Sequence, residues 1–189
     1  MTGKWEKAYL GLGSNLGRRE GNLAAAIQAL NEAPANSISS DRDDCTPVAT
    51  LIRVLRSSGI YETAPWGLED QQDFLNSVIE VETLLTPAGL LERIKGVEHT
   101  LGRKPGVRYG PRLIDIDILL FGNQVVEQAE LQIPHLRLHL RAFALIPLAE
   151  LVPSLVHPVL NLTVGQLVRQ VDCREGVRSW APPPAVLGK

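Results

Sequence analysis

The sequence has almost no cysteine. Only Cys45 and Cys173 occur among its 189 residues, far apart and without a CxxC pair or the spacing of a zinc site. This argues against a disulfide framework and against a structural zinc domain. Because isolated cysteines are typical of reducing compartments, we expect a cytoplasmic protein.

The sequence also has little net charge and no long apolar run. Its formal net charge of −2 at pH 7 excludes the overall basic excess of a general nucleic-acid or membrane-surface binder. No stretch approaches the roughly 18 apolar residues that a membrane-spanning helix needs. The first seven residues contain no apolar core of a signal peptide. We therefore expect neither nucleic acid nor a membrane as a partner, and we find no internal repeat.

What the chain does contain is enough apolar material for one domain. Hydrophobic residues make up 44% of the sequence, and a chain of this length fits a single core. We expect one domain over 1–180, with a polar surface insertion at 31–47. The last residues, 181–189, include three consecutive prolines and are expected to form a flexible tail.

Hydrophobic spacing predicts a regular order of strands and helices. Apolar runs and two-residue alternation predict strands, and apolar residues at helical spacing predict helices. The four strands are expected at 8–13, 48–61, 74–83 and 113–121, and the two helices at 22–30 and 86–101. Thr86 followed by Pro87 is typical of a helix start, and Gly102 of a helix end.

This order is that of a ferredoxin-like βαββαβ core, an α+β fold with an antiparallel sheet. We expect the helices on one face of the sheet and the other face open. The remaining residues are C-terminal additions. They comprise a strand at 130–135, a short helix within 136–151 and a further helix at 164–171.

The most informative stretch is a basic turn at Gly110 and Pro111 that leads into a strand with two aspartates. Side chains alternate along a strand, so Asp115 and Asp117 lie on one face, about 7 Å apart along the backbone. Mg²⁺ prefers carboxylate oxygen and completes its shell with water and phosphate. Cationic groups suited to phosphate come from Arg103, Lys104, Arg108 and Arg112.

A second interpretation is a half-exposed strand whose carboxylates point into water. The alternation puts Leu113, Leu119 and Phe121 on the aspartate face. It puts the other apolar residues on the opposite face, namely Ile114, Ile116, Ile118 and Leu120. An apolar aspartate face argues against simple exposure, because adjacent like charges there repel and lose hydration. The pattern alone leaves both interpretations open.

Several other polar features also have two interpretations. The glycine-rich turn at 11–17 matches neither the dinucleotide fingerprint nor a P-loop, which favours a structural turn over a phosphate site. Asn76 is either a satisfied core amide or a ligand contact, and the first is favoured. The Glu98 carboxylate either stays in water at the edge of its helix stripe or reaches a polar site. His135 is either a turn residue or, with its basic neighbours, a phosphate contact.

The residues from 108 to 119 resemble a known signature. The pattern Arg-x-Gly-Pro-Arg-x-x-Asp-Ile-Asp-Ile-Leu is similar to that of the 6-hydroxymethyl-7,8-dihydropterin pyrophosphokinase family of folate biosynthesis. Further ordered matches occur at 11–17, 61–67, 73–76, 134–135 and 141–143. The resemblance covers most of the chain from Ala8 to about Pro153.

The resemblance implies a reaction and its cofactors. The hydroxymethyl oxygen of the pterin attacks the β-phosphorus of ATP, and AMP leaves. Asp115 and Asp117 would hold two Mg²⁺ ions, with Asp117 as a candidate acceptor for the hydroxyl proton. Arg103 and Arg112 would be catalytic with them. The partners would be small molecules, ATP and the dihydropterin, and we expect a monomer.

The resemblance also implies a set of binding residues. ATP would be bound by Arg103, Arg108, Tyr109, Arg112, Ile118, Leu131, His135 and Arg141, with Ile118 and Leu131 flanking the adenine. The pterin would be bound by Thr63, Pro65, Trp66, Phe74, Asn76 and Phe143. The loops around Pro65 and over 102–109 would close as lids. Within the second loop, Arg103 and Lys104 are interchangeable in the match.

Two other classes remain open at this point. A different Mg-ATP-dependent phosphotransferase would share the dicarboxylate but would release ADP. A non-catalytic relative that binds nucleotide or pterin would keep the fold without the chemistry. The presence of both aspartates favours the enzyme.

Overall fold

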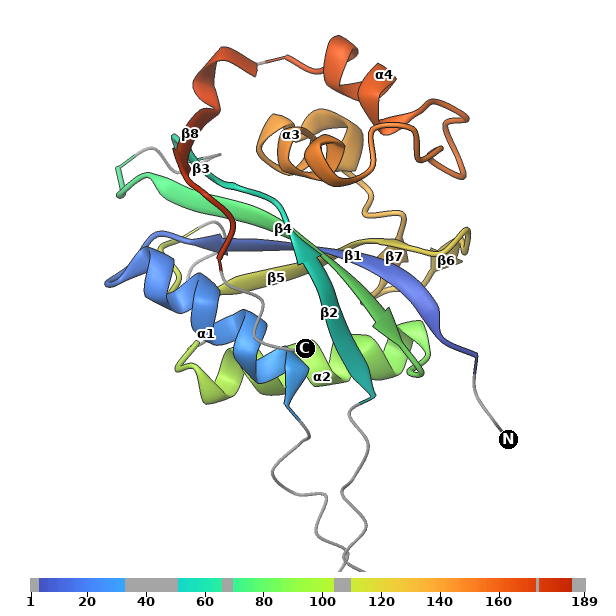
Figure 1. Cartoon of the computed structure of the whole chain (residues 1–189), viewed down its shortest axis with the longest axis horizontal. Helices are drawn as coiled ribbons and strands as arrows, with labels where there is room; N and C mark the ends of the chain where they lie inside the picture. Colours follow the sequence, from blue (N-terminus) through green and yellow to red (C-terminus); the bar gives the residue numbers. More distant parts are fainter. Residues whose placement is uncertain (1–3, 33–50, 66–69, 104–109, 173, 185–189) are drawn as a thin grey trace, which may run out of the picture.

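The computed structural model describes residues 4–32, 51–65, 70–103, 110–172 and 174–184. A six-stranded sheet lies between two layers of helices (Figure 1). Strand β1 (Glu6–Ser14) pairs antiparallel with β4 (Phe74–Thr83) on one side and with β5 (Asp115–Phe121) on the other. Strands β2 (Ile52–Ser57) and β3 (Ile60–Thr63) both pair with β4. The predicted ferredoxin-like core is confirmed.

Helices α1 (Arg19–Asn31) and α2 (Pro87–Thr100) pack on one face of the sheet (Figure 1). Both ends of α2 follow the sequence signals. Thr86 accepts a hydrogen bond from the Gly89 N–H, and Pro87 occupies the first helical position, where no amide donor is needed. Gly102 adopts a φ of 88° just beyond the helix, a conformation that favours glycine.

The opposite face of the sheet is covered in part, which corrects the expectation of an open face. Helix α3 (Ala142–Leu151) packs there, after a short 3₁₀ turn at Leu138–Leu140, and α4 (Val164–Gln170) packs on α3 (Figure 1). The reason is that β4 is apolar on both faces. Ile79 and Val81 join the α1/α2 core, whereas Val78 joins a second core under α3 and α4. A sheet that is apolar on both faces needs cover on both.

A bulge in β5 corrects the predicted alternation at its end. The register against β1 shifts between Tyr9 and Leu10, which pair with Leu120 and Ile118 respectively. The extra residue, Leu119, inverts the side-chain pattern beyond it. Leu120 therefore lies in the α3/α4 core, and Phe121 lies in the α1/α2 core. Both were predicted on the opposite faces.

Other strands also differ from expectation. The predicted strand at 48–61 is two strands, because Ser58 turns inward between them. Its N–H donates to the Val78 C=O at 2.8 Å, and its hydroxyl oxygen accepts the Val78 N–H at 2.9 Å. The strand expected at 130–135 is only β7 (Gln132–Ile133), which pairs with β6 (Val126–Glu127).

A C-terminal strand, β8 (Arg178–Ala181), was not predicted at all and pairs with β3. It includes Ala181, the first residue of the expected tail. Most of the expected insertion lies outside the described residues, so its position at the surface stays a prediction.

Candidate active site

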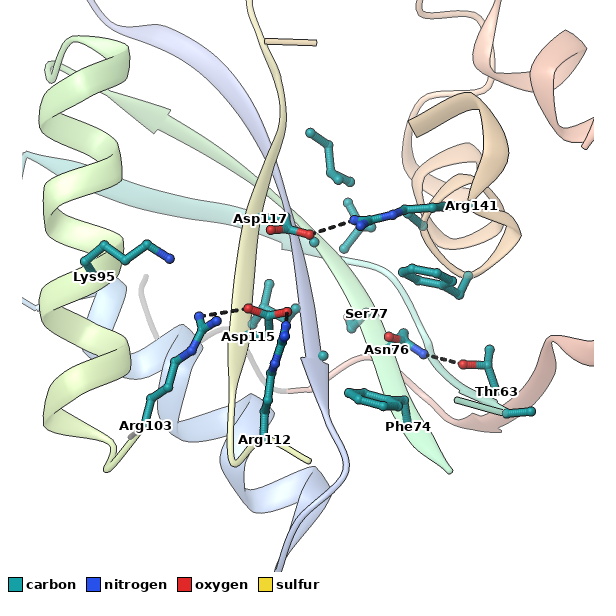
Figure 2. A pocket seen from close by; sticks show the side chains of 18 residues that line it. Thr63, Phe74, Asn76, Ser77, Lys95, Arg103, Arg112, Asp115, Asp117 and Arg141 are labelled. Carbon is teal, nitrogen blue, oxygen red and sulfur yellow. Dashed lines mark hydrogen bonds and ion pairs between the residues drawn. The ribbon is translucent and has the colours of Figure 1, made fainter. Parts of the chain in front are cut away.

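A cavity of about 240 Å³ lies where β1, β4 and β5 meet the ends of α2 and α3 (Figure 2). It is lined by residues from six elements and their flanks. The lining consists of Gly11, Leu12, Gly13, Thr63, Ala64, Phe74, Asn76, Ser77, Val78, Lys95, Arg103, Arg112, Asp115, Asp117, Leu119, Arg141, Phe143 and Ala144.

The β5 wall of the cavity is charged. Asp115 and Asp117 both line it, as the alternation predicted, with side chains that are 22% and 40% exposed. Arg103 Nη1 lies 2.8 Å from one Asp115 oxygen, and Arg112 pairs with the other. Arg141 Nη1 lies 2.8 Å from Asp117 (Figure 2).

Cations outnumber carboxylates in the described lining. Two aspartates face four cationic side chains, those of Lys95, Arg103, Arg112 and Arg141. The four positive and two negative charges sum to +2, although the whole chain carries −2. A concave site with this excess attracts a polyanion such as a triphosphate.

Glu98 organises the charged wall from beneath. Its side chain is almost fully buried, with 2% exposure, so the interpretation of a carboxylate in water is wrong. It accepts the Ile116 N–H at 2.8 Å and pairs with Arg103 and Lys95. Ile116 stands between the two aspartates, so Glu98 holds both the strand that carries them and an arginine that contacts one of them.

His135 lies beside Asp117 and Arg141. Its Nε2 is 3.8 Å from an Asp117 oxygen and 3.1 Å from Arg141 Nη1. Burial lowers the pKa of His135, and the neighbouring Arg141 lowers it too, although the Asp117 charge acts in the opposite direction. The net effect is a pKa below the ordinary value, which favours the neutral ring.

The β3/β4 wall of the cavity is neutral and tightly packed. Asn76 is 6% exposed and donates from Nδ2 to the Thr63 hydroxyl at 2.9 Å (Figure 2). It is thus both a satisfied amide and a cavity residue. A Cβ at Gly13 would lie 3.2 Å from Asn76 Oδ1, which explains a glycine there. Phe74 and Phe143 add aromatic surface. A flat heteroaromatic ring with a hydrogen-bonding edge fits these groups.

The remaining predicted residues lie elsewhere. Ile118 and Leu131 are buried in the α1/α2 core and are not part of the lining, and Pro65 is half-buried beside it. Trp66, Arg108 and Tyr109 lie outside the described residues, as does most of both expected lids. The binding roles of these six residues stay predictions, as do the roles of the predicted residues that line the cavity. Lys95 was missed, although its position three residues before Glu98 on α2 places the two on one side of the helix.

The donor set fits Mg²⁺ only together with a nucleotide. Within the part of the chain that the structure describes, no three or more His, Cys, Asp or Glu side chains cluster to hold a metal ion. Mg²⁺ is usually bound by one or two carboxylates, and substrate phosphates and water complete its shell. Two partly exposed aspartates beside arginine side chains match that mode.

A dicarboxylate among guanidinium groups, opposite an aromatic and amide wall, fits the class of enzymes that transfer a phosphate-containing group from a nucleotide to a flat acceptor. The model of one family, 7,8-dihydro-6-hydroxymethylpterin-pyrophosphokinase (HPPK), matches residues 9–153. The chain belongs to this family. It is an ATP-dependent pyrophosphokinase, a transferase of folate biosynthesis that moves pyrophosphate from ATP to the hydroxymethyl group of the dihydropterin.

Two sequence relatives support the same family assignment. The chain is 43% identical over 166 residues to a 2-amino-4-hydroxy-6-hydroxymethyldihydropteridine pyrophosphokinase of Methylorubrum extorquens, covering 88% of this chain and 94% of the relative. It is 39% identical over 173 residues to the Bacillus subtilis protein of the same name, covering 92% and 89%.

Solved structures resemble this fold. The HPPK-DHPS of Plasmodium falciparum with pterin and p-hydroxybenzoate matches with a TM-score of 0.67 at 17% identity, over 93% of this chain. The chain spans 45% of the length of that HPPK-DHPS chain. At this identity the match supports the fold alone. Separately, no helix among the described residues is long and apolar enough to span a membrane.

Proposed function

We propose that Asp115 and Asp117 hold two Mg²⁺ ions while the pterin hydroxyl attacks the β-phosphorus of ATP. A bond forms between the hydroxymethyl oxygen and that phosphorus. The bond from the β-phosphorus to the oxygen bridging to the α-phosphate breaks, and AMP leaves. The observation that carries this proposal is the pair of neighbouring carboxylates on β5, both lining a cavity with excess positive charge. When bound, Mg²⁺ supplies Lewis-acid activation and a template for the phosphates.

The arginines would exchange partners on nucleotide binding. Arg103, Arg112 and Arg141 contact the two aspartates. With Mg²⁺ held by Asp115 and Asp117, these guanidinium groups would turn to the phosphate oxygens, which accept charge-assisted hydrogen bonds from them. We therefore assign the three arginines and His135 to the triphosphate. Arg108 and Tyr109 are proposed to add contacts from the loop, and Ile118 and Leu131 to flank the adenine.

The neutral wall orients the acceptor. Asn76 is proposed to read the polar edge of the pterin, with its amide held by Thr63, while Phe74 and Phe143 stack on the ring. Pro65 and Trp66 are proposed to close over it. Such chemistry depends mainly on placing the hydroxyl oxygen in line with the phosphorus. We assign Asp117 as the acceptor of the hydroxyl proton.

Three broader properties belong to the same proposal. The chain forms one domain over 1–180, works as a monomer and resides in the cytoplasm. Support for one domain comes from α3, which packs directly on β4 and β3 of the core sheet. Support for the compartment comes from the two isolated cysteines. Light scattering coupled to gel filtration tests the monomer, and a mass twice that of the chain would contradict it.

A ³¹P NMR spectrum of ATP, Mg²⁺, the dihydropterin and the protein tests the reaction. AMP together with a new diphosphate ester is the expected result. ADP with a monophosphate ester would assign the site to a γ-phosphoryl kinase. No turnover with active substrate would favour a non-catalytic binding protein.

A further inference from the structure

Asn15 is a fully buried amide that does not line the cavity but bonds two segments that lead to it. It follows β1 directly, and its side chain is 0% exposed. A buried amide must have its donors and acceptor paired, because an unpaired polar group in the interior is costly. The hydrogen-bond partners of Asn15 therefore show which segments of the chain it connects.

The partners of Asn15 come from two distant segments. Nδ2 donates to Gln71 Oε1 at 2.9 Å and to the Gln72 C=O at 3.1 Å. Oδ1 accepts the Arg112 N–H at 2.7 Å, and the Asn15 N–H donates to the Arg112 C=O at 3.1 Å. The nitrogen faces two acceptors and the oxygen faces one donor, so only one orientation of the amide satisfies every contact.

These two segments lead to opposite walls. Gln72 is two residues before Phe74, the first residue of β4 and part of the neutral wall. Arg112 pairs with Asp115 in the charged wall. The single side chain of Asn15 thus connects the backbone that precedes the pterin wall with the backbone that carries a phosphate-side arginine.

We propose that Asn15 is a positioning residue that sets the distance between the pterin wall and the phosphate wall. This inference rests on the proposed function, which assigns one substrate to each wall. Attack of the hydroxyl on phosphorus needs the two substrates aligned, and a misplacement of about 1 Å can cost about 100-fold in rate. The loss of Asn15 should therefore lower kcat while each substrate, bound alone, keeps its affinity.

A neighbouring asparagine offers a control. Asn22, in the first turn of α1, also donates two amide hydrogen bonds, to Ser14 Oγ at 3.1 Å and to the Leu16 C=O at 2.8 Å. Ser14 ends β1 and Leu16 lies in the turn after it, so Asn22 connects α1 to that turn without connecting the walls. A purely structural role of the turn predicts similar effects for both asparagines.

The experiment compares Asn15→Asp with Asn22→Asp. The aspartate at 15 still accepts the Arg112 N–H but loses both donors to Gln71 and Gln72. We expect kcat to fall about 10- to 100-fold for Asn15→Asp and to change less than about twofold for Asn22→Asp, a substitution away from the walls. Calorimetry of a non-hydrolysable Mg-ATP analogue and of the pterin, each titrated alone, should give affinities within about threefold of wild type.

A second pair keeps the test decisive if Asn15→Asp does not fold. Gln71 is half-buried, and its side-chain oxygen is one of the acceptors. Gln71→Glu keeps that acceptor and should keep kcat, whereas Gln71→Ala should lower kcat in the same sense as Asn15→Asp, by a smaller factor. Equal kcat in the two Gln71 variants would overturn the proposal.

Two other results would also overturn it: equal kcat losses at positions 15 and 22, or a loss explained entirely by weaker binding of one substrate. Failure of the proposed function has a different signature. In that case Phe74→Ala and Asn76→Ala would leave pterin affinity unchanged, whatever the Asn15 variants do.

Discussion

The two walls of the cavity are built on different physical principles. The β5 wall consists of charges that are paired with one another and partly open to water, with Asp117 40% exposed. The β3/β4 wall consists of neutral groups in close contact, with Asn76 6% exposed and held by Thr63. Charge pairs near water are easily exchanged for other charges, whereas a packed amide is rigid. The comparison indicates one wall that rearranges around Mg-ATP and one that is preformed for a flat ring.

The largest expected effect comes from neutralising the charged wall. Asp115→Asn and Asp117→Asn should each lower kcat by at least about 100-fold, the cost of removing one preorganised electrostatic contact, because the amide binds Mg²⁺ poorly. Steady-state kinetics measures the loss, and circular dichroism should show an intact fold. Asp172→Asn, an exposed aspartate at the end of α4, is the control. Unchanged turnover in both active-site variants would disprove the metal assignment.

A smaller effect is expected from disturbing the neutral wall. Gly13→Ala would place a Cβ 3.2 Å from Asn76 Oδ1, so the amide must shift. We expect pterin affinity to fall about tenfold, or about 1.4 kcal/mol, with Mg-ATP affinity unchanged. Gly96→Ala in α2 is the matched control, since its Cβ would meet nothing within 4 Å. Isothermal titration with each ligand alone measures the two affinities. Equal losses of affinity for both ligands would contradict the difference between the two walls.

Ionic strength should separate the walls without any mutation. Raising salt from 0.05 to 0.5 M shortens the screening length, which is about 10 Å at 0.1 M. Binding of the Mg-ATP analogue should weaken several-fold if its phosphates are bound by Arg103, Arg112 and Arg141 as proposed, whereas pterin binding should change little. Fluorescence titrations at matched pH measure both. A similar salt dependence for the two ligands would show that charged groups also contribute to the affinity for the pterin.

The smallest effect concerns the pH dependence of stability. Because burial lowers the pKa of His135, the unfolded chain takes up a proton more readily than the folded one as pH falls below the ordinary value of 6.5. Stability is therefore retained above that pH and lost as the solution becomes more acidic. His135→Gln should flatten the fall in unfolding free energy between pH 7.5 and 5.0, measured by urea denaturation.

In the His135→Gln variant, His157 still makes the unfolding free energy fall at acid pH, because burial lowers the pKa of His157 too. The double variant with His157→Gln should flatten the profile further. A steeper acid-side loss in His135→Gln than in wild type would mean that the ring is charged in the folded protein.

Local sequence patterns were sufficient wherever neighbours along the chain decide the structure. The start of α2 at Thr86 and Pro87 follows from capping, which involves residues three apart. The shared face of Asp115 and Asp117 follows from the two-residue repeat of a strand. The family signature added expected roles for the cavity residues, and the structure brings Asp115, Asp117, Asn76, Phe74 and Arg141 together around one space.

The tertiary structure alone decided what depends on partners far away in the chain. The bulge that exchanges Leu120 and Phe121 arises from pairing with β1, and β8 exists because β3 offers it an edge. The burial of Asn15 has no signature in its spacing, and the position of Glu98 at the edge of its helix stripe left its environment open. Glu98 accepts a backbone N–H from a residue 18 positions away, and Asn15 accepts one from a residue 97 positions away. Periodicity encodes which way a side chain points, whereas hydrogen bonds between distant segments are set only when the packed core brings those segments together.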